Sequence, residues 1–491
     1  MSYLGIDLGT SGLRALLMSD NGAILGAVEK SYTSDHKHSG WSEQDPAHWT
    51  KALNAAAHDL ADQHRAFADL KAIGVAGHMH GATLLDAAGD VIRPCILWND
   101  TRSHAEARAL DQTKGVRALS GNIVFPGFTA PKLRWVQQHE PDNFARTAKV
   151  LLPAGYLNFY LTGDYVADMS DSAGTSWLDV ARRDWSAPLL HAGQMTRDQM
   201  PRLVEGSQPA GTLRADLAAQ WGVSKDVVIA GGAGDNAAAA CGIGALNDGD
   251  GFLSLGTSGV LLAARNGCFP APASALHTFC HAVPERWYQM GVMLSATDSL
   301  NWLASITGTS APDLTKALGP TLRSPGPAMF LPYLSGERTP HNDADIRGSF
   351  TGLGVRTTAT DMTQSVLEGV AFGLRDSLEA FHRTGTQIDR LMAIGGGAQS
   401  DYWLKLIATV LNITLERPKD GEFGAAMGAA RLATMAHTGA PSVDILTKPD
   451  VAEAIEPDPT LTGVFTEAYQ VFKKAYPKIK SAQRSPQVEQ T

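Results

Sequence analysis

The pentapeptide LGTSG occurs twice in the chain, at residues 8–12 and 255–259. Each copy follows a short strand-like run, and the two copies lie about half a chain apart. A tight Gly-Thr-Ser-Gly turn that leaves a strand presents several backbone N–H groups and two hydroxyls, which suits a bound phosphate. The two turns therefore predict a duplicated fold whose halves face each other across one phosphate-bearing ligand. A chance repeat of five common residues is the alternative.

The residue before the repeat differs between the two copies. Asp7 precedes the first copy, whereas Ser254 precedes the second. A carboxylate beside a phosphate-binding turn suits Mg²⁺, which sheds water reluctantly and takes few protein ligands. An Asp before a glycine turn is also a common turn former. The adjacent turn favours the metal-binding role for Asp7, and a single metal–nucleotide complex needs only one such carboxylate.

Length and composition narrow the class of protein. With 491 residues the chain is too long for one hydrophobic core, so two or three domains are expected. The net charge is −9 and no basic run stands out, which argues against nucleic acid or an anionic membrane as a main partner. There is no long apolar run, and the four cysteines are scattered. We therefore expect a cytoplasmic protein without a signal peptide or a transmembrane helix.

The order of expected elements indicates an α/β fold. Strands at 3–7, 13–19 and 24–30 form a meander that is typical of the opening of the actin-like (ribonuclease H-like) ATPase fold. The second half repeats this style around its own LGTSG turn, so we expect two such domains with a cleft between them. A helix is predicted over 361–383 by apolar residues at helical spacing. The expected divisions are an N-terminal domain over 1–245, a C-terminal domain over 246–440, and a helical extension with a polar tail over 441–491.

Asp235 begins an expected helix after Gly231-Gly232-Ala233-Gly234. The small residues before it predict that a ligand approaches the backbone closely. The helix N-terminus favours the anion of Asp235, which prepares it to accept a proton as a general base. The structural alternative is that Asp235 only caps the helix. A cap tolerates Ser or Asn at this position, whereas a general base does not.

Three further segments carry weaker signals. GGGAQS (395–400), between a strand and a helix, suits the adenosine and α-phosphate part of a nucleotide. GHMHG (77–81) has no partner with zinc spacing, so contact with a polyhydroxylated ligand is favoured over metal, and a structural histidine remains a rival. The stretch LSGERTPHND (334–343) either lines the cleft or orders a surface loop through Glu337 and Arg338.

Taken together, these residues resemble the FGGY family of carbohydrate kinases, within the sugar kinase, actin and Hsp70 fold superfamily. Two stretches match the signature patterns of that family: GFTAPKLRWVQQH (127–139) and GSFTGLGVRTTATDMTQSVLEG (348–369). The resemblance runs from the first strand to about residue 435, and it is greatest to the members that phosphorylate D-xylulose. The segments with that character are WSEQDP (41–46), MHG (79–81), LWND (97–100), PGFTAPKL (126–133), DMSDSAGT (168–175), GDNAA (234–238), SLGTSGV (254–260) and LPYLSGERTPH (331–341).

Two positions bear on the choice of sugar within the family. Asn236 follows Asp235, whereas the members that phosphorylate glycerol typically carry Gln at that point. His78 is a departure, because many bacterial relatives have Gln there, and it puts the polar contacts near the sugar in doubt.

The resemblance implies ATP-dependent phosphorylation of D-xylulose to D-xylulose 5-phosphate with Mg²⁺, by in-line transfer between a sugar-binding N-terminal domain and a nucleotide-binding C-terminal domain. It implies that Asp235 is the general base and that Asp7 lies at the metal and aids catalysis. The sugar contacts implied are Met79, His80, Asp235 and Asn236. The nucleotide contacts implied are Thr10, Ser11, Gly12, Gly256 and Thr257 for the phosphates and Gly396, Gly397 and Ala398 for adenosine. A homodimer is a family expectation.

Two alternatives stay open at this point. In the first alternative, the enzyme phosphorylates another ketose or polyol accepted by the same family, such as a ribulose, a deoxy-xylulose or a pentitol. The sequence leaves this open because a few hydrogen bonds decide between such sugars. In the second alternative, the chain is a non-catalytic, nucleotide-gated sensor with the same fold. Asp235 favours the kinase, since a sensor needs no base beside the γ-phosphate.

Overall fold

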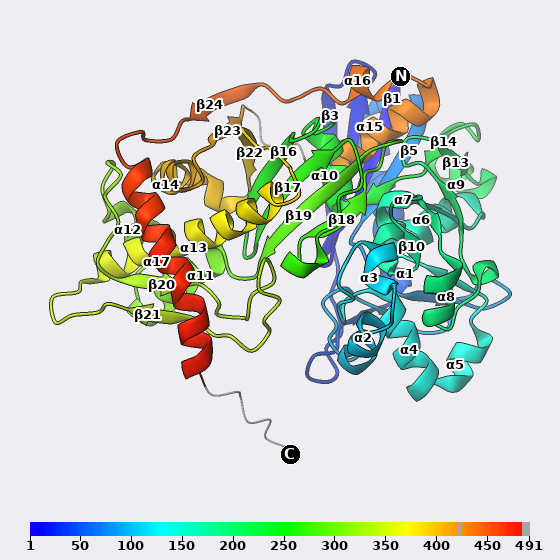
Figure 1. Ribbon diagram of the computed structural model, residues 1–491. Coiled ribbons are helices and arrows are strands. Elements are labelled where there is room, and N and C mark those ends of the chain that lie inside the picture. The colour runs from blue at the N-terminus through cyan, green and yellow to red at the C-terminus, as the bar shows by residue number, and fades with distance from the viewer. Residues whose placement is uncertain (420–423, 484–491) are drawn as a thin grey trace.

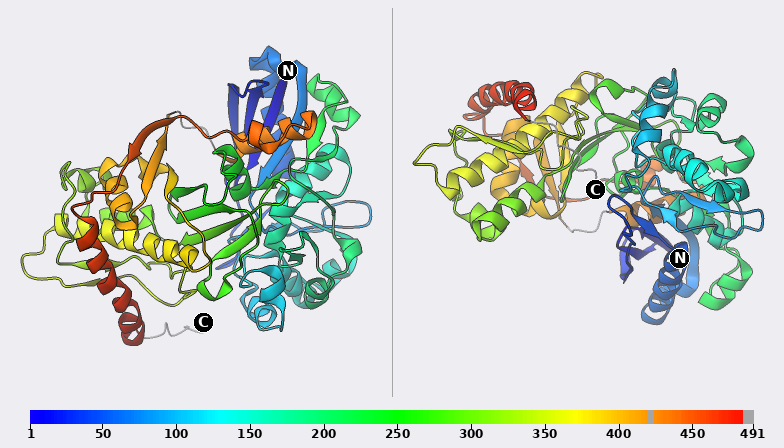
Figure 2. Two further views of the ribbon diagram at one scale, coloured as in Figure 1. Left: turned by 45° about the horizontal axis from the view of Figure 1, so that its top comes forward. Right: turned by 90° about the horizontal axis from the view of Figure 1, so that it is seen from below.

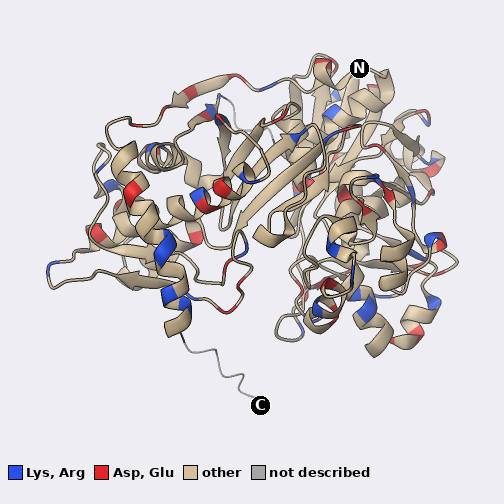
Figure 3. Ribbon diagram, in the orientation of Figure 1, with Lys and Arg blue, Asp and Glu red and all other residues tan. Residues whose placement is uncertain are grey.

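The computed structural model describes residues 1–419 and 424–483 and divides into two lobes. Figure 1 shows the first lobe, which is mostly blue to blue-green with an orange helical segment, beside the second, which is mostly green to red, and Figure 2 shows the same arrangement from two other sides. Each lobe is built around one large mixed sheet. Lys and Arg are interspersed with Asp and Glu over both lobes (Figure 3). Among the described residues, every helix is too short or too polar to cross a bilayer.

The two large sheets share one strand topology. In the first sheet the spatial order is β13 (Pro209–Thr212), β14 (Val228–Ala230), β5 (Leu70–Gly77), β1 (Ser2–Leu8), β2 (Gly12–Ser19) and β3 (Ile24–Ser31), with the short β15 (Ala233–Gly234) also paired to β5. In the second it is β18 (His277–Cys280), β19 (Trp287–Met293), β17 (Gly259–Arg265), β16 (Gly251–Leu255), β22 (Arg390–Ile394), β23 (Thr414–Pro418) and β24 (Val451–Ile455).

Strand directions confirm that the fold is duplicated. In the first sheet β1 is antiparallel to β2 and parallel to β5, which is in turn parallel to β14. In the second sheet β16 is likewise antiparallel to β17 and parallel to β22, which is parallel to β23. The two LGTSG turns therefore join equivalent strand pairs, β1–β2 and β16–β17. The expected fold of two actin-like α/β domains is confirmed.

Short sheets and helices cover these two sheets. The short pairs are β4 (Glu43–Gln44) with β7 (Cys95–Ile96), β6 (Thr83–Leu85) with β8 (Lys149–Leu151), β9 (Val166–Asp168) with β12 (Arg202–Val204), β10 (Leu178–Asp179) with β11 (Asp184–Trp185), and β20 (Met329–Leu331) with β21 (Ser349–Thr351). The helices before residue 246 are α1 (Pro46–Gln63), α2 (His104–Asp111), α3 (Val116–Ser120), α4 (Thr129–His139), α5 (Pro141–Arg146), α6 (Pro153–Thr162), α7 (Met169–Ser172), α8 (Ala187–Ala192), α9 (Ala215–Trp221) and α10 (Asp235–Gly242). Those after it are α11 (Thr297–Thr307), α12 (Ala311–Lys316), α13 (Ala359–His382), α14 (Asp401–Leu411), α15 (Ala425–Thr438), α16 (Ser442–Ile445) and α17 (Thr462–Ala482).

Helix α13 shows how the sequence specifies an element of the second lobe. Thr358 and Asp361 form a capping box at its N-terminus, in which each side chain accepts the backbone N–H of the other residue. Its apolar face then packs against α14, β19 and β20. The predicted helix over 361–383 is therefore confirmed, with its start two residues earlier because of the cap.

Helix α15 follows the second sheet in sequence yet packs against the first sheet. It lies on β1 and β5 and against α10, so a helix from the second half of the chain covers the first sheet. The approach is close because glycines face the partner backbones: a Cβ on Gly5 would lie 1.9 Å from the carbonyl oxygen of Ala426, and one on Gly428 would lie 1.7 Å from that of Ala238. The expected boundary at 245/246 falls between α10 and β16 and stays a prediction.

We expect Gly428→Ala to lower the free energy of unfolding by about 1–3 kcal/mol, because the added methyl group collides with the backbone of α10. Gly463→Ala in α17 is the matched control, because no atom lies within 4 Å of its added Cβ. The control is expected to be neutral or slightly stabilising, since Ala is the better helix former. Denaturant unfolding of both variants measures the difference, and equal stabilities would contradict the close packing of α10 on α15.

Strand β7 is limited to Cys95–Ile96, since the preceding Pro94 has no N–H for a strand ladder. One expected element differs from the structure. The helical extension over 441–491 is partly wrong, because its residues Val451–Ile455 form β24 at the edge of the second sheet. Four of these five residues are exposed, so the segment carries little apolar alternation. The expected polar tail beyond residue 483 lies outside the described residues.

Candidate active site

The carboxyl ends of three strands bring Asp7 and Asp235 to the same edge of the first sheet. Asp7 on β1 and Ala233 on β15 both pair with Ala76 of β5, and both pairings are parallel. Asp235 follows Gly234, the last residue of β15. The carboxyl edge of such a sheet is where α/β folds bind ligands. The side chains are close enough that the charge of Asp235 raises the pKa of Asp7.

The first LGTSG turn has its carbonyl groups occupied by the protein. The hydroxyl of Tyr32 donates to the Gly9 carbonyl at 2.7 Å, and its backbone N–H donates to the Ser11 carbonyl at 3.1 Å. Gln44 Nε2 donates to the Thr10 carbonyl at 2.6 Å. Within the part of the chain that the structure describes, the N–H groups of Thr10 and Ser11 make no hydrogen bond. The turn is therefore held through its acceptors and keeps its donors for an anion.

The second LGTSG turn is built in a similar way. Thr297, at the start of α11, donates to the Gly256 carbonyl from both its hydroxyl, at 2.8 Å, and its backbone N–H, at 3.0 Å. The Ala296 N–H donates to the Thr257 carbonyl at 2.8 Å. The Thr257 and Ser258 N–H groups have no acceptor among the residues that the structure describes, and both residues are exposed. This turn therefore also presents amide donors.

Asp235 is the first residue of α10, and Gly234 occupies the capping position. Its Oδ1 accepts the Asn236 N–H at 2.7 Å and Asn236 Nδ2 at 2.9 Å. Its Oδ2 makes no hydrogen bond within residues 1–419 and 424–483, and the side chain is only partly buried. One oxygen therefore fixes the carboxylate on its own helix, and the other is free to accept a proton.

Burial raises the pKa of both acids. The pKa of Asp235 rises to about 6, with the hydrogen bonds from Asn236 opposing the shift. The pKa of Asp7 rises to about 7, through burial first and the charge of Asp235 second, against the lowering effect of Arg14. Two carboxyl groups with raised pKa values at one sheet edge are typical of a functional site. A divalent cation beside Asp7 would relieve the repulsion between them.

The donor set around Asp7 fits Mg²⁺ in one particular mode. Within the described residues there is no group of three or more His, Cys, Asp or Glu side chains that could form a complete metal site. Mg²⁺ in phosphoryl-transfer enzymes is instead held by one or two carboxylates, water and the phosphates of the substrate. Asp7, next to the amide donors of Thr10 and Ser11, meets that requirement.

Met79 lies against Gly234, the residue before Asp235, and His80 lies against Gly174. A Cβ on Gly234 would lie 2.7 Å from Met79 Cγ, and one on Gly174 would lie 2.6 Å from the His80 ring. The Nδ1 of His80 bonds the Gly174 carbonyl at 2.7 Å, so Nδ1 carries the proton and Nε2 is left as an acceptor. Burial lowers the pKa of His80 to about 3, which keeps the ring neutral. A neutral imidazole with a free acceptor suits a sugar hydroxyl.

The backbone of His80 is held in a left-handed conformation, with φ at 71°. Its carbonyl accepts Lys132 Nζ at 2.8 Å and the Thr129 hydroxyl at 3.2 Å. Both residues belong to the signature-like stretch 127–139, and burial lowers the pKa of Lys132 to about 7. Lys132 therefore helps to hold the backbone of His80 in place through the His80 carbonyl. This role could not be predicted, because a buried lysine inside an amphipathic helix has the same sequence pattern as an exposed one.

The side chain of His78 has a different environment from that of His80. Its ring is buried, and neither ring nitrogen has a hydrogen-bond partner among the described residues. It packs edge-on against Trp49, with ring centroids 5.7 Å apart. Burial lowers the pKa of His78 to about 3, so it carries no charge.

The segment GGGAQS (395–400) lies at a cavity of about 980 Å³ in the second lobe. Gly396 and Gly397 line it together with Gly256, Thr297 and Asn301, whereas Ala398 is buried in the core of the lobe. The size suits a nucleoside with part of its phosphate chain. The cavity thus connects the second LGTSG turn with the segment after β22. Asn301 gave no sequence signal, since it lies inside the helical pattern of α11.

The glycines before Asp235 have a different role from the expected one. A Cβ on Gly232 would lie 2.2 Å from the Val75 carbonyl oxygen, and one on Gly231 would lie 2.4 Å from that of Glu205. The space beside them is therefore filled by the protein's own backbone. The expectation that a ligand approaches there is wrong, because close packing of the chain and close approach of a ligand both require glycine.

Asp100 and Trp98, at the end of β7, have separate roles. Asp100 is fully used in a buried ion pair with Arg102, and its Oδ2 also accepts the Ser42 N–H at 2.6 Å. Trp98 is 47% exposed, and its Nε1 donates to the Thr10 hydroxyl at 2.9 Å. Of these two residues, Trp98 therefore contacts the first LGTSG turn.

Comparison with known proteins agrees with this arrangement. Models of the N-terminal and C-terminal domains of the FGGY family of carbohydrate kinases match residues 2–242 and 251–437. Xylulose kinase of Escherichia coli strain K12 is 45% identical over 480 residues, which cover 97% of this chain and 99% of that protein. A crystal structure of a xyloylose kinase from Brucella ovis has a TM-score of 0.97 at 54% identity, covering 98% of this chain and 100% of that one.

A more distant structure agrees in fold. Xylulose kinase from Rhodospirillum rubrum has a TM-score of 0.91 at 27% identity, covering 98% of this chain and 99% of that one. The duplicated sheets, the paired acids and the family models point to the same conclusion. The chain belongs to the FGGY family of carbohydrate kinases and is a sugar kinase that uses ATP.

Proposed function

We propose that the chain is a xylulokinase, which transfers the γ-phosphoryl group of ATP to the C5 hydroxyl of D-xylulose. The observation that carries this proposal is the half-free carboxylate of Asp235, which directly follows the glycine that packs against Met79. The relatives from Escherichia coli and Klebsiella pneumoniae, both named xylulose kinase, support the choice of sugar at 45% and 44% identity.

In this proposal Asp235 Oδ2 accepts the proton of the acceptor hydroxyl as that oxygen attacks the γ-phosphorus in line. His80 Nε2 and Asn236 bind other hydroxyl groups of the sugar, and Met79 provides an apolar contact. The transition state of phosphoryl transfer is loose, so positioning and charge neutralisation supply more of the rate than proton removal does.

The nucleotide is proposed to bind with adenosine in the cavity at Gly396 and Gly397 and with its β- and γ-phosphates on the two LGTSG turns. The N–H groups of Thr10 and Thr257, with those of their neighbours, donate to the phosphate oxygens. Asp7 would hold Mg²⁺, and the ion would neutralise charge on the phosphates when bound. Closure of the lobes excludes water, which is otherwise a competing nucleophile.

The pH dependence of kcat/KM for the sugar follows from the ionisation of Asp235. A general base must be deprotonated, and burial raises the pKa of Asp235 to about 6. We expect kcat/KM to be constant from about pH 7 to 8 and to fall about tenfold for each pH unit below 6. A profile with saturating MgATP measures this limb, and a flat profile down to pH 5 would contradict the assignment of the base.

The acceptor is identified by coupled ADP release with D-xylulose, D-ribulose, 1-deoxy-D-xylulose and xylitol at one concentration. The proposal predicts strong stimulation by D-xylulose. Greater stimulation by another acceptor would move the assignment within the family.

We also propose that the protein is cytoplasmic and forms a homodimer. Its four free thiols support a cytoplasmic location. Light scattering tests whether it is a dimer.

A further inference from the structure

We propose that Arg338 of the second lobe binds the end of the sugar that lies away from the reacting hydroxyl, and so determines which acceptors the enzyme takes. This inference depends on the proposed sugar kinase mechanism. It assigns a role to the stretch LSGERTPHND, for which the sequence left two interpretations open.

The residues on either side of Arg338 are fixed to the end of β19. The Thr339 N–H donates to the Val292 carbonyl at 3.0 Å, and the Val292 N–H donates to the Thr339 hydroxyl at 3.0 Å. Glu337 Oε1 accepts the Leu294 N–H at 3.1 Å. Glu337 and Thr339 are both buried. Because these neighbours are tied to one strand, the backbone of Arg338 is held in one place.

The guanidinium of Arg338 has no hydrogen-bond partner within the described residues. It lies over the ring of Phe125, which belongs to the first lobe, at 4.5 Å from the centroid. The side chain is partly buried, so it is neither solvated like a surface arginine nor paired like a core one. An arginine has five N–H donors, and leaving them without acceptors in a partly buried place is costly. A ligand with oxygen acceptors would satisfy them.

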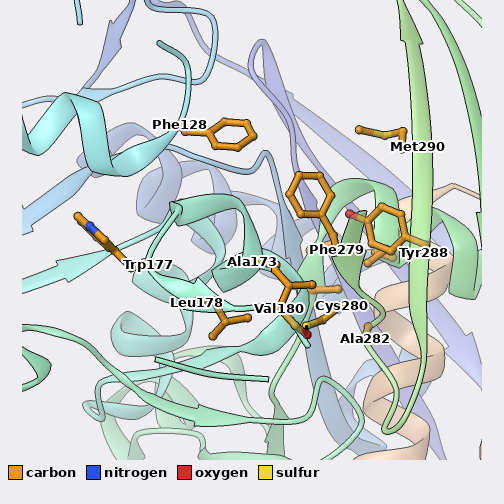
Figure 4. Packing of buried hydrophobic residues seen from close by; sticks show 14 of the residues in the cluster. Phe128, Ala173, Trp177, Leu178, Val180, Phe279, Cys280, Ala282, Tyr288 and Met290 are labelled. Atoms are coloured by element: carbon orange, nitrogen blue, oxygen red, sulfur yellow. Dashed lines mark hydrogen bonds between the residues drawn. The ribbon is translucent and has the colours of Figure 1, made fainter. Parts of the chain in front are cut away.

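A cluster of buried aromatic rings connects Arg338 with His80, one of the proposed sugar contacts. Phe125 packs against Phe128 at 5.6 Å between centroids, and Phe128 stacks on His80 at 4.4 Å with a 13° interplanar angle. Figure 4 shows Phe128 from the first lobe facing Phe279 on β18, whose centroid lies 6.3 Å away. Phe125 and Phe128 therefore connect the guanidinium of Arg338 with the ring of His80.

The same cluster of rings continues from Phe279 towards Asp235. Phe279 lies beside Tyr288 in Figure 4, with centroids 5.7 Å apart, and the Tyr288 hydroxyl contacts Met79 Sδ at 3.8 Å. Met79 in turn packs against Gly234, the residue before Asp235. This chain of contacts connects Arg338 with the residue that precedes Asp235.

Electrostatics agree with this order. Burial lowers the pKa of both His80 and His277, and the charge of Arg338 lowers each further, whereas the pKa of Asp235 responds to burial and to Asn236. If the C5 hydroxyl lies at Asp235, the C1–C2 end of a ketose lies towards Arg338. A guanidinium only donates, and a ketone oxygen only accepts, so the two groups are complementary. A site built for such a bond discriminates against an acceptor that lacks it.

The experiment compares R338Q with R356Q, which removes the same charge from an exposed position in the second lobe. Sugar affinity is measured by calorimetry without nucleotide, and steady-state kinetics are measured with D-xylulose and xylitol. We expect R338Q to raise the Kd and KM for D-xylulose about 10–100-fold, to reduce the preference for D-xylulose over xylitol, and to leave the affinity for ATP little changed. R356Q is expected to behave like wild type.

Phe125→Leu separates sugar binding from a bracing contact between the lobes. It removes the ring under Arg338 but leaves the guanidinium in place. If it reproduces the whole effect of R338Q, or if R338Q keeps the preference for D-xylulose, the inference is overturned. Thermal unfolding of each variant confirms that it is folded. If wild type prefers another acceptor, the proposed choice of sugar fails, and the same comparison with that acceptor still tests Arg338.

Discussion

Asp235→Asn is expected to lower kcat for sugar phosphorylation by about 10²–10⁴-fold and to leave ATP binding measurable. The substitution preserves the shape of the side chain and the acceptor for Asn236, but removes the basic oxygen Oδ2. Asp235→Ala is expected to be at least as inactive. Coupled ADP release measures the rate, and equilibrium titration measures nucleotide affinity. Retention of more than a small fraction of turnover would assign the base elsewhere.

The stability of Asp235→Asn separates loss of chemistry from loss of fold. A carboxyl whose folded pKa is raised from 3.8 to about 6 favours the folded state below about pH 4, and this contribution is lost as the pH rises through 6. At pH 8 the ionised Asp235 therefore costs stability, whereas Asn does not. We expect the variant to be more stable than wild type at pH 8, by on the order of 1–2 kcal/mol, and the difference to shrink towards pH 4.

Asp7→Asn is expected to raise the Mg²⁺ concentration needed for half-maximal rate and to lower the maximal rate about 10–1,000-fold. Burial and the charge of Asp235 raise the pKa of Asp7 to about 7, so its carboxylate gains most from a nearby cation. Titration of MgCl₂ at a fixed concentration of free ATP measures the requirement.

Asp20→Asn is the matched control for Asp7→Asn. Asp20 follows β2 in the turn at the far end of the same hairpin, and its side chain is 54% exposed. The control is expected to keep the Mg²⁺ dependence of wild type. An Asp7→Asn variant with that same dependence would reduce Asp7 to a turn-forming residue.

The fold could be predicted because its strongest signals are local. The LGTSG repeat marks equivalent turns of the two sheets, and the capping box and apolar face of α13 define the longest helix. Strand β24 could not be predicted, because an exposed edge strand has little apolar alternation. The position of α15 on the first sheet also escaped prediction, because close packing through Gly428 depends on a partner that lies far away in sequence.

The candidate site could be predicted where residue type and position coincide. Asp7 lies near the end of β1, Asp235 directly follows β15, and His80 lies in a glycine-flanked turn. Arg338 and Lys132 could not be assigned, because their roles depend on burial and on missing or unusual partners. The glycines before Asp235 were misread for the same reason, since the sequence does not say what fills the space beside them.

The central claim is that the carboxylate of Asp235 faces the acceptor alcohol. A crystal structure with D-xylulose and a non-hydrolysable ATP analogue bound, and with the lobes closed, tests it most directly. We predict that Oδ2 of Asp235 lies about 2.6–3.2 Å from the C5 hydroxyl oxygen. A carboxylate turned away from the sugar, with both oxygens bonded only to helix α10, would contradict the claim.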